Sequence, residues 1–195
     1  MDDKIYVALD EAGRGALAGD VYCAAVIWNP RMNHPLVESI RDSKKLNAQQ
    51  RDTLYDFIVE NAIDYAIASA DVKTIDTINI LQANMKAMHS ALDALDVDFQ
   101  HILVDGNYFK PYKNISHTCV IKGDDKYIPI AAASILAKVA RDRHMKDLAS
   151  QFPEYGWGTN FGYGTPEHFE AINAHGITEY HRRSFAPCAS FSQKT

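Results

Sequence analysis

The strongest constraint on the fold is an apolar segment that ends in two acidic residues. Residues 5–9 have the apolar, β-prone composition of a buried strand. Asp10 and Glu11 follow at once, and carboxylates at the end of such a strand are unfavourable unless a positive charge meets them. The segment Gly13-Arg14-Gly15 comes next, and glycine lets a backbone approach a bound molecule closely. This order of strand, carboxylates and glycine loop indicates a functional site rather than a folding requirement.

Length and composition are those of an ordinary globular protein. The 195 residues suit one domain, and hydrophobic and charged contents are 47% and 23%. Apolar runs are too short to span a membrane, and the polar N-terminus leads directly into a strand, so we expect no signal peptide and no membrane contact. Cys23, Cys119 and Cys188 are widely spaced without a CxxC pattern, which disfavours disulfides and a zinc site. We expect buried thiols at Cys23 and Cys119, and a reducing, cytoplasmic location.

The net charge of −5 argues mildly against nucleic-acid binding. Four acidic residues in one site would account for most of this excess, and bound cations would reverse their charge locally. Basic residues are also clustered, at Lys44-Lys45, Lys122, Lys126, Lys138, Arg141, Arg143 and Arg182-Arg183. A nucleic-acid partner is therefore compatible with the charge.

The hydrophobic pattern predicts a sheet covered by helices, of the α/β or α+β class. The expected strands are residues 21–28, 65–70, 101–104 and 117–121, in addition to the first. The expected helices are residues 47–59 with Asn47 as N-cap, an amphipathic helix over 75–95 with a buried Met85 and Met88, and residues 130–148. We expect one domain, 1–195, whose segment from about 155 to 195 wraps the site.

Acidic residues follow three of the predicted strands. They are Asp10 with Glu11, then Asp105, then Asp124 or Asp125. Strand ends that are distant in sequence commonly assemble one site in α/β enzymes. Mg²⁺ takes oxygen ligands and few carboxylates per ion, so four carboxylates fit two ions that together cleave a phosphodiester. A turn-capping role remains open for Asp105, but Asp10 and Glu11 have no such role.

An ordered series of short motifs extends the pattern over nearly the whole chain. They are Asp10-Glu11-Ala12-Gly13-Arg14-Gly15, Asp42-Ser43-Lys44-Lys45-Leu46, Asn79-Ile80-Leu81-Gln82-Ala83, Leu103-Val104-Asp105-Gly106-Asn107, Lys122-Gly123-Asp124, residues 131–139, Arg141-Asp142, Gly162-Tyr163-Gly164-Thr165 and His181-Arg182-Arg183-Ser184-Phe185. This set resembles the ribonuclease HII family, also called type 2 ribonuclease H. The resemblance implies a ribonuclease H-like mixed β-sheet flanked by helices, with a helical C-terminal part.

The resemblance also implies an activity. The family hydrolyses RNA in RNA–DNA hybrids and incises 5′ of single ribonucleotides embedded in duplex DNA, leaving 3′-hydroxyl and 5′-phosphate ends, with Mg²⁺ or Mn²⁺. It implies that the metal ligands are Asp10, Glu11, Asp105 and Asp124. The adjacent Asp125 makes the last assignment ambiguous, and we favour Asp124 because it directly follows the glycine of the motif.

Further residues match substrate-binding positions of that family. They are Gly13, Arg14 and Gly15, which match the loop that reads the 2′-hydroxyl, Tyr163, which matches the tyrosine that packs on the sugar, and Lys44, Ser134, Arg182 and Arg183. Tyr163 alone would suggest a core residue, but the glycines on either side indicate an exposed turn. Arg141 and Arg143 are interpreted as surface charge, and Asp142 as half of an ion pair within its helix. Ala16 and Asp20 stand where the family usually has prolines.

Other interpretations remain open. A type 3 ribonuclease H shares the metal site, but usually carries an additional N-terminal domain. A weakly catalytic nucleic-acid-binding module and a different two-metal nuclease on the same fold are further alternatives. The tail from Phe185 to Thr195 contains Phe191 and could dock a replication clamp, although a frayed terminus is the simpler interpretation. We expect a monomer.

Overall fold

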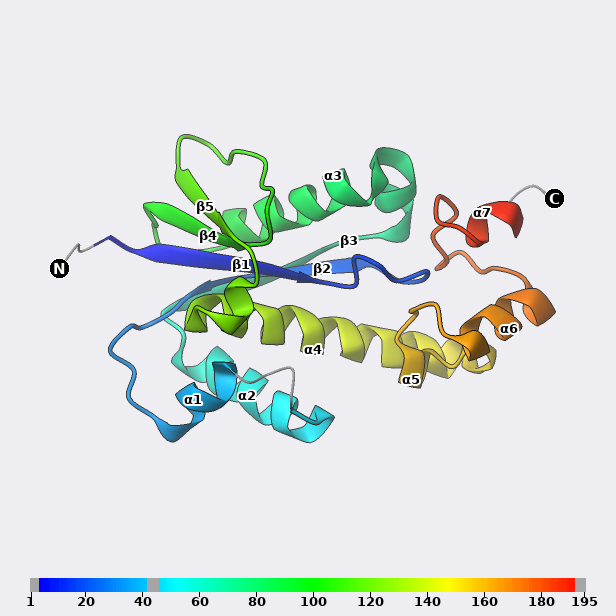
Figure 1. The fold of residues 1–195 in the computed structure, drawn as a ribbon, viewed down its shortest axis with the longest axis horizontal. Coiled ribbons are helices and arrows are strands. Elements are labelled where there is room, and N and C mark those ends of the chain that lie inside the picture. The colour runs from blue at the N-terminus through cyan, green and yellow to red at the C-terminus, as the bar shows by residue number, and fades with distance from the viewer. Residues whose placement is uncertain (1–3, 42–45, 192–195) are drawn as a thin grey trace.

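A mixed five-stranded sheet with helices on both faces forms the centre of the protein (Figure 1). The computed structural model describes residues 4–41 and 46–191. The strands are β1 (Tyr6–Ala12), β2 (Val21–Ile27), β3 (Asp64–Ala70), β4 (His101–Asp105) and β5 (Ser116–Val120). They agree closely with the strands expected from the sequence, and the expected mixed sheet flanked by helices is confirmed.

The strand order β3-β2-β1-β4-β5 explains how distant acidic residues meet. The first three strands form antiparallel pairs, whereas β1, β4 and β5 run parallel to one another. Leu9 pairs with Val104, and Asp105 pairs with Val120. The carboxyl ends of the three parallel strands therefore lie at the same edge of the sheet.

Two long helices cover the two faces of the sheet. Helix α3 (Val72–Asp93) packs on one face and buries Met85 and Met88, as expected. Helix α4 (Ile128–Gln151) packs on the other face, where Ala131, Ala132 and Ala133 are fully buried and allow close approach to the strands. Helices α1 (Pro35–Arg41) and α2 (Ala48–Asn61) lie beyond α4 (Figure 1). A short helix, η2 (Gly123–Asp125), links β5 to α4.

The C-terminal segment forms a third hydrophobic cluster beyond the end of β1 (Figure 1). It contains η3 (Pro153–Tyr155), α5 (Trp157–Asn160), α6 (Pro166–His175) and α7 (Cys188–Phe191). Leu17 and Ala18, from the loop after β1, belong to the same cluster. The main-chain N–H groups of both donate to the carbonyl oxygen of Gly162, at 2.8 and 3.2 Å. The segment therefore lies directly against the glycine loop.

Local details confirm part of the sequence interpretation and correct another part. Asn47 caps α2 in a reciprocal capping box with Gln50, as expected from the N-cap assignment. Cys23 is buried, but Cys119 is only half-buried, because β5 is the edge strand of the sheet. Helix α3 contains a kink at Asn79, whose φ of 66° is left-handed, and the Asn79 side chain caps the following turn at Gln82. The regular pattern of apolar residues gave no indication of this kink.

Candidate active site

The acidic residues lie along the carboxyl edge of the parallel strands. Asp10 and Glu11 lie near the end of β1, and Asp105 is the last residue of β4. Asp124 follows β5 within η2, and its neighbour Gly123 donates its N–H to Asp105 at 2.6 Å. The four predicted ligands thus come from three neighbouring strand ends.

Asp10 and Glu11 face opposite sides of the sheet, because successive residues of a strand alternate. Asp10 faces α4, and the Ser134 hydroxyl donates to its carboxylate. Glu11 faces α3, and the side-chain amide of Asn84 donates to it. Each carboxylate is therefore oriented by a different helix.

The site strongly disfavours uncompensated negative charge. Burial raises the pKa of Asp10 well above its usual value, and the charges of Glu11 and Asp105 raise it further. Burial also raises the pKa of Glu11, which the Arg14 guanidinium, 3.6 Å away, partly opposes. Carboxylates that repel one another in a buried position fit a site for cations.

The structure distinguishes Asp124 from Asp125. Asp124 is 8% exposed and lies beside Gly123, whereas Asp125 is exposed on the surface. This difference in exposure supports the choice of Asp124.

Carboxylate oxygens suit divalent ions, although two of these carboxylates accept hydrogen bonds from main-chain N–H groups in this structure. Asp10 accepts the N–H of Glu11 at 2.7 Å, and Asp105 accepts that of Gly123. In the part of the chain that the structure describes, no three Asp, Glu, His or Cys side chains stand close enough together to hold an ion as they are. Rotation of the Asp10 and Asp105 side chains would release these contacts and free both carboxylates for a metal ion.

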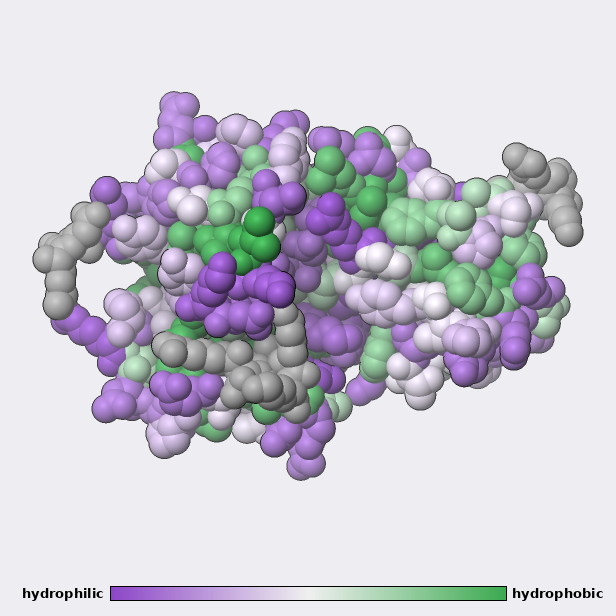
Figure 2. Space-filling view, viewed as in Figure 1, coloured by the Kyte–Doolittle hydropathy of each residue, from purple (hydrophilic) through white to green (hydrophobic). Residues whose placement is uncertain are grey.

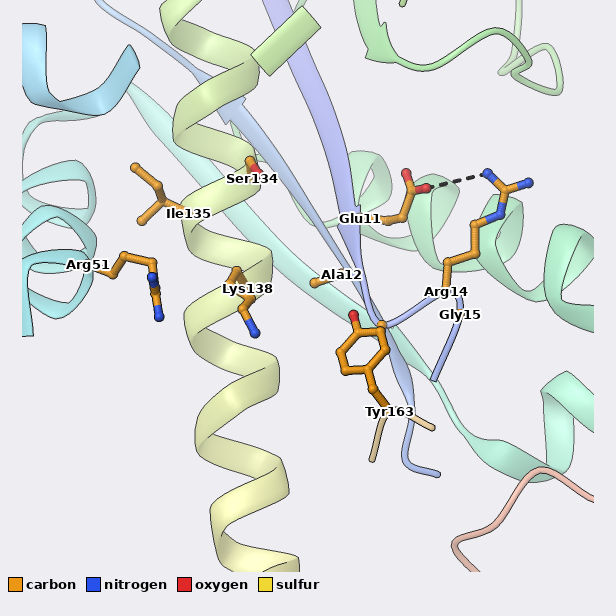
Figure 3. Close-up of a pocket in the computed structure, with 10 residues that line it drawn as sticks. Glu11, Ala12, Arg14, Gly15, Arg51, Ser134, Ile135, Lys138 and Tyr163 are labelled. Carbon is orange, nitrogen blue, oxygen red and sulfur yellow. Dashed lines mark ion pairs between the residues drawn. The ribbon is translucent and has the colours of Figure 1, made fainter. Parts of the chain in front are cut away.

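A hollow of about 440 Å³ opens beside the acidic residues (Figure 3). Its walls are formed by Glu11, Ala12, Gly13, Arg14, Gly15, Arg51, Ser134, Ile135, Lys138 and Tyr163. The glycine loop and Tyr163 lie at one end, and Arg51 and Lys138 lie across from them on α2 and α4 (Figure 3). Tyr163 is 37% exposed and belongs to this wall, not to the core. Five of the predicted substrate-binding residues, Gly13, Arg14, Gly15, Ser134 and Tyr163, therefore line one hollow.

Comparison with known proteins assigns the family. The family model described as Ribonuclease HII matches residues 7–188. The chain is 52% identical to the ribonuclease HII of Christiangramia forsetii over 183 residues, which cover 93% of this chain and 91% of the relative. The chain belongs to the ribonuclease HII family.

Solved structures agree with this assignment. The ribonuclease H2 of Pyrococcus horikoshii superposes with a TM-score of 0.79 and 26% identity, covering 95% of this chain and 96% of that one. A structure of the PCNA:RNase HII complex from Archaeoglobus fulgidus gives a TM-score of 0.75 at 22% identity, covering 93% and 95%. As a ribonuclease HII, the chain is a metal-dependent endoribonuclease. None of the described helices is long and apolar enough to cross a membrane.

Within this ribonuclease HII fold, Arg182 is not placed to bind phosphate. Its guanidinium is fully buried and donates to the carbonyl oxygens of Arg14 and Gly19. The phosphate-contact interpretation of Arg182 is therefore wrong, since solvent and ligands cannot reach the group. Arg183 is exposed, and its phosphate contact stays a prediction. Lys44 lies outside the described residues.

Helix α4 also corrects the interpretation of its charged residues. Arg141 is fully buried and is not surface charge, whereas Arg143 is exposed and pairs with Asp52 at 3.0 Å. The expected helix ion pair of Asp142 is confirmed, with Lys138 as its partner at 2.6 Å. Arg51, on the wall of the hollow, was not identified from the sequence, because an arginine within a polar helix face gives no distinctive signal.

The two residues that replace the usual prolines of ribonuclease HII are both accommodated. Ala16 is buried, and its N–H donates to Gly13 at 3.3 Å within the glycine turn. The Asp20 carboxylate accepts the N–H of Val72 at the start of α3, and burial raises its pKa. Asp20 therefore points toward α3 and does not line the hollow.

Proposed function

We propose that this ribonuclease H incises duplex DNA on the 5′ side of a single embedded ribonucleotide and also hydrolyses the RNA strand of RNA–DNA hybrids. The products would be 3′-hydroxyl and 5′-phosphate ends. This activity would begin the removal of misincorporated ribonucleotides, as a step of ribonucleotide excision repair. The enzyme would therefore recognise a single 2′-hydroxyl group within a long duplex.

The observation that carries the proposal is the shared hollow of Gly13, Arg14, Gly15, Tyr163 and Glu11. Only the 2′-hydroxyl separates RNA from DNA at a single nucleotide. Main-chain groups of a glycine loop can donate to and accept from that hydroxyl without a side chain in between. The Tyr163 ring offers a flat apolar surface to the adjacent sugar. The groups that would recognise the 2′-hydroxyl and one acidic residue of the site therefore line the same hollow.

Asp10, Glu11, Asp105 and Asp124 would hold the catalytic Mg²⁺ or Mn²⁺ ions. Two such ions, when bound, activate the attacking water and stabilise the leaving oxygen of the scissile phosphodiester. Ser134 orients Asp10, and Asn84 orients Glu11, through the hydrogen bonds described above. The mutual repulsion of Asp10, Glu11 and Asp105 supports this assignment.

Basic side chains around the hollow would contact the phosphates of the substrate. Lys138 and Arg51 both reach its wall, opposite Tyr163. Lys138 is partly neutralised by Asp142, so it would act as a hydrogen-bond donor more than as a free charge. Lys44 and Arg183 complete the proposed set on the basis of the family motifs.

We further propose that residues 1–195 act as one catalytic domain in which the segment from about 155 onward binds substrate. The three free cysteines are compatible with a reducing cytoplasm. The complex formed by the Archaeoglobus relative supports a clamp contact in the family. In this chain Phe191 packs against the third hydrophobic cluster, so clamp docking through it would require the tail to detach.

The test is incubation with end-labelled duplex DNA that carries one ribonucleotide, with Mg²⁺, with Mn²⁺ and with EDTA. We expect a single cut, 5′ of the ribonucleotide, that requires metal. An all-DNA duplex is the matched control and should stay intact. An intact single-ribonucleotide duplex beside a cleaved hybrid would show that the substrate assignment is wrong.

A further inference from the structure

Arg141 connects the glycine loop to the turn that carries Tyr163. It lies on α4 and is fully buried. Its Nε donates to the carbonyl of Asp20 at 3.1 Å and its Nη2 to that of Ala18 at 3.0 Å. Its Nη1 donates to the carbonyl of Phe161 at 2.9 Å. One planar group therefore fixes main-chain atoms of two loops that are far apart in sequence.

The same guanidinium also supports the tyrosine ring. Its central carbon lies 5.2 Å from the centre of the Tyr163 ring, within the range of a cation–π contact. Phe161 and Gly162, just before Tyr163, both have left-handed backbones, with φ of 51° and 77°. A left-handed Phe161 is strained, so the bond to its carbonyl stabilises a turn that would otherwise relax.

Arg182 holds the other side of the glycine loop. Its Nη1 donates to the carbonyl of Arg14 at 3.0 Å, and its Nε and Nη2 donate to that of Gly19 at 3.0 and 2.8 Å. The two arginines together bind the carbonyls of residues 14, 18, 19 and 20. Burial, and to a lesser extent the charge of Arg141, lowers the pKa of Arg182 to about 10, so Arg182 is still cationic at neutral pH.

The main chain at Gly13 packs directly against the Arg141 side chain, with no room for a side chain at position 13. A Cβ added at Gly13 would lie 1.9 Å from Arg141 Nε, and its φ of 90° also favours glycine. The loop thus rests directly on the guanidinium. A shift of Arg141 would be transmitted to Gly13 on one side and to Tyr163 on the other.

We propose that Arg141 is a positioning residue that sets the distance between the Gly13–Gly15 loop and Tyr163. This inference rests on the proposed role of these two elements as readers of the ribonucleotide. Arg141 does not line the hollow and touches no substrate. It acts by holding both reading elements in one rigid arrangement, which a nucleotide must match before it is cleaved.

The chemistry of the contact requires arginine. Three donors in a fixed plane satisfy three carbonyls in different directions, whereas the lysine ammonium is a single point on a flexible stem. Arg141→Lys keeps the positive charge but loses the planar arrangement of three donors. Misplacement of a reading group by a fraction of an ångström lowers the rate strongly and leaves phosphate contacts, which dominate binding, in place.

The experiment compares kcat and KM of wild type, Arg141→Lys and the matched control Arg143→Lys, well below their melting temperatures. Substrates are the single-ribonucleotide duplex and a continuous hybrid. We expect Arg141→Lys to lower kcat about tenfold or more on whichever substrate wild type cleaves, with KM within about twofold. Arg143→Lys, which alters an exposed pair on the same helix, should leave both values unchanged.

A second variant separates positioning from folding. Arg141→Ala should lose activity and recover part of its kcat in millimolar guanidinium chloride, while the same concentration of urea, neutral and of similar shape, has no effect. Recovery with guanidinium supports the proposal. A loss that merely follows the folded fraction measured by circular dichroism, an unchanged kcat in Arg141→Lys, or no rescue would overturn it. The proposed function is tested separately, because it fails if the wild type leaves the single-ribonucleotide duplex uncut.

Discussion

The Cys23 thiol lies 3.2 Å from the side-chain oxygen of Asn84, and this contact determines which way the Asn84 amide points. Burial raises the pKa of Cys23 well above its usual value, so the thiol stays protonated and can donate. The Asn84 nitrogen is then directed at Glu11. We predict that Asn84→Ala lowers kcat by about 10–100-fold and weakens Mn²⁺ binding, as loss of a group that orients a metal ligand does. Isothermal titration with Mn²⁺ beside the cleavage assay measures both effects. Wild-type Mn²⁺ affinity in the variant would contradict this role.

Asp124 and Asp125 should differ sharply in their importance. We predict that Asp124→Asn removes most activity, because Asp124 is buried next to Gly123, whose N–H contacts Asp105. Asp125→Asn should leave activity within about twofold of wild type, since loss of a ligand, unlike loss of a surface charge, misplaces an ion. Initial rates in Mg²⁺ measure both variants. Equal losses of activity in the two variants, or a larger loss in Asp125→Asn, would contradict the assignment of Asp124 as the ligand.

Metal-free protein should be stabilised by removing the Asp10 charge. The pKa of Asp10 is raised by folding, so the folded state binds its proton more tightly than the unfolded state does. Stability without metal therefore falls as pH rises above about 4, where the unfolded carboxyl ionises. We predict that Asp10→Asn raises the melting temperature in EDTA by a few degrees and reduces the increase that Mn²⁺ produces in wild type. Calorimetric scans in EDTA and in saturating Mn²⁺ provide the comparison, and a lower melting temperature for the variant in EDTA would argue against charge repulsion.

Tyr163 should matter for cleavage and little for stability. Its ring lies on the wall of the hollow, so Tyr163→Ala should lower activity strongly. The stability loss should stay well below the about 3–5 kcal/mol typical of a buried aromatic truncation. Tyr163→Phe, the matched variant, keeps the ring over Arg141 and should retain more activity. Thermal melts run beside the cleavage assay distinguish the effects, and a melting-temperature drop in proportion to the activity loss would exclude a reading role.

Acid should destabilise the C-terminal segment through a buried histidine pair. His168 donates to the carbonyl of Tyr163 at 2.9 Å and accepts from the Trp157 indole at 3.0 Å. His181 accepts the N–H of Thr178 on Nδ1, so both rings are neutral. Burial lowers the pKa of His181 to about 3, whereas the unfolded residue titrates near its ordinary value of about 6.5. The unfolded state therefore binds the extra proton between these values, and stability is lost as pH falls through this window, by about 1.4 kcal/mol per pH unit for one group.

Urea unfolding at pH 7 and pH 5 measures this loss. The variant His181→Gln should be less stable than wild type at pH 7 and show a shallower decrease toward pH 5. The Trp157 fluorescence, which reports the indole hydrogen bond, should change in the same pH range. An equal loss of stability between pH 7 and pH 5 in the variant would show that other groups are responsible for the titration.

Local patterns predicted the secondary structure well where one face of an element is buried. The apolar run of β1, the Asn47 cap and the α3 stripe each depend on residues close in sequence. Helix α6 has comparable signals, with Thr165 as N-cap and Pro166 at the first position, and could have been found from them. The positions of Asp10, Asp105 and Asp124 followed from their places after strands. Their arrangement along one edge of the sheet depends on the parallel pairing of β1, β4 and β5, which no local pattern encodes.

The buried arginines were beyond such reasoning. A charged residue is expected at the surface, because burying a guanidinium is unfavourable without partners. The partners of Arg141 and Arg182 are main-chain carbonyls. Every residue has such a group, so no sequence pattern indicates these partners. For the same reason, a motif match could identify the position of Arg182 but could not indicate whether its side chain reaches phosphate or protein.

The bond between Arg182 and the Arg14 carbonyl joins residues 168 positions apart. During synthesis, the sheet strands and all four acidic residues leave the ribosome before residue 182 does. The Arg182 contacts that fix the glycine loop therefore form only after the C-terminal segment has been synthesised.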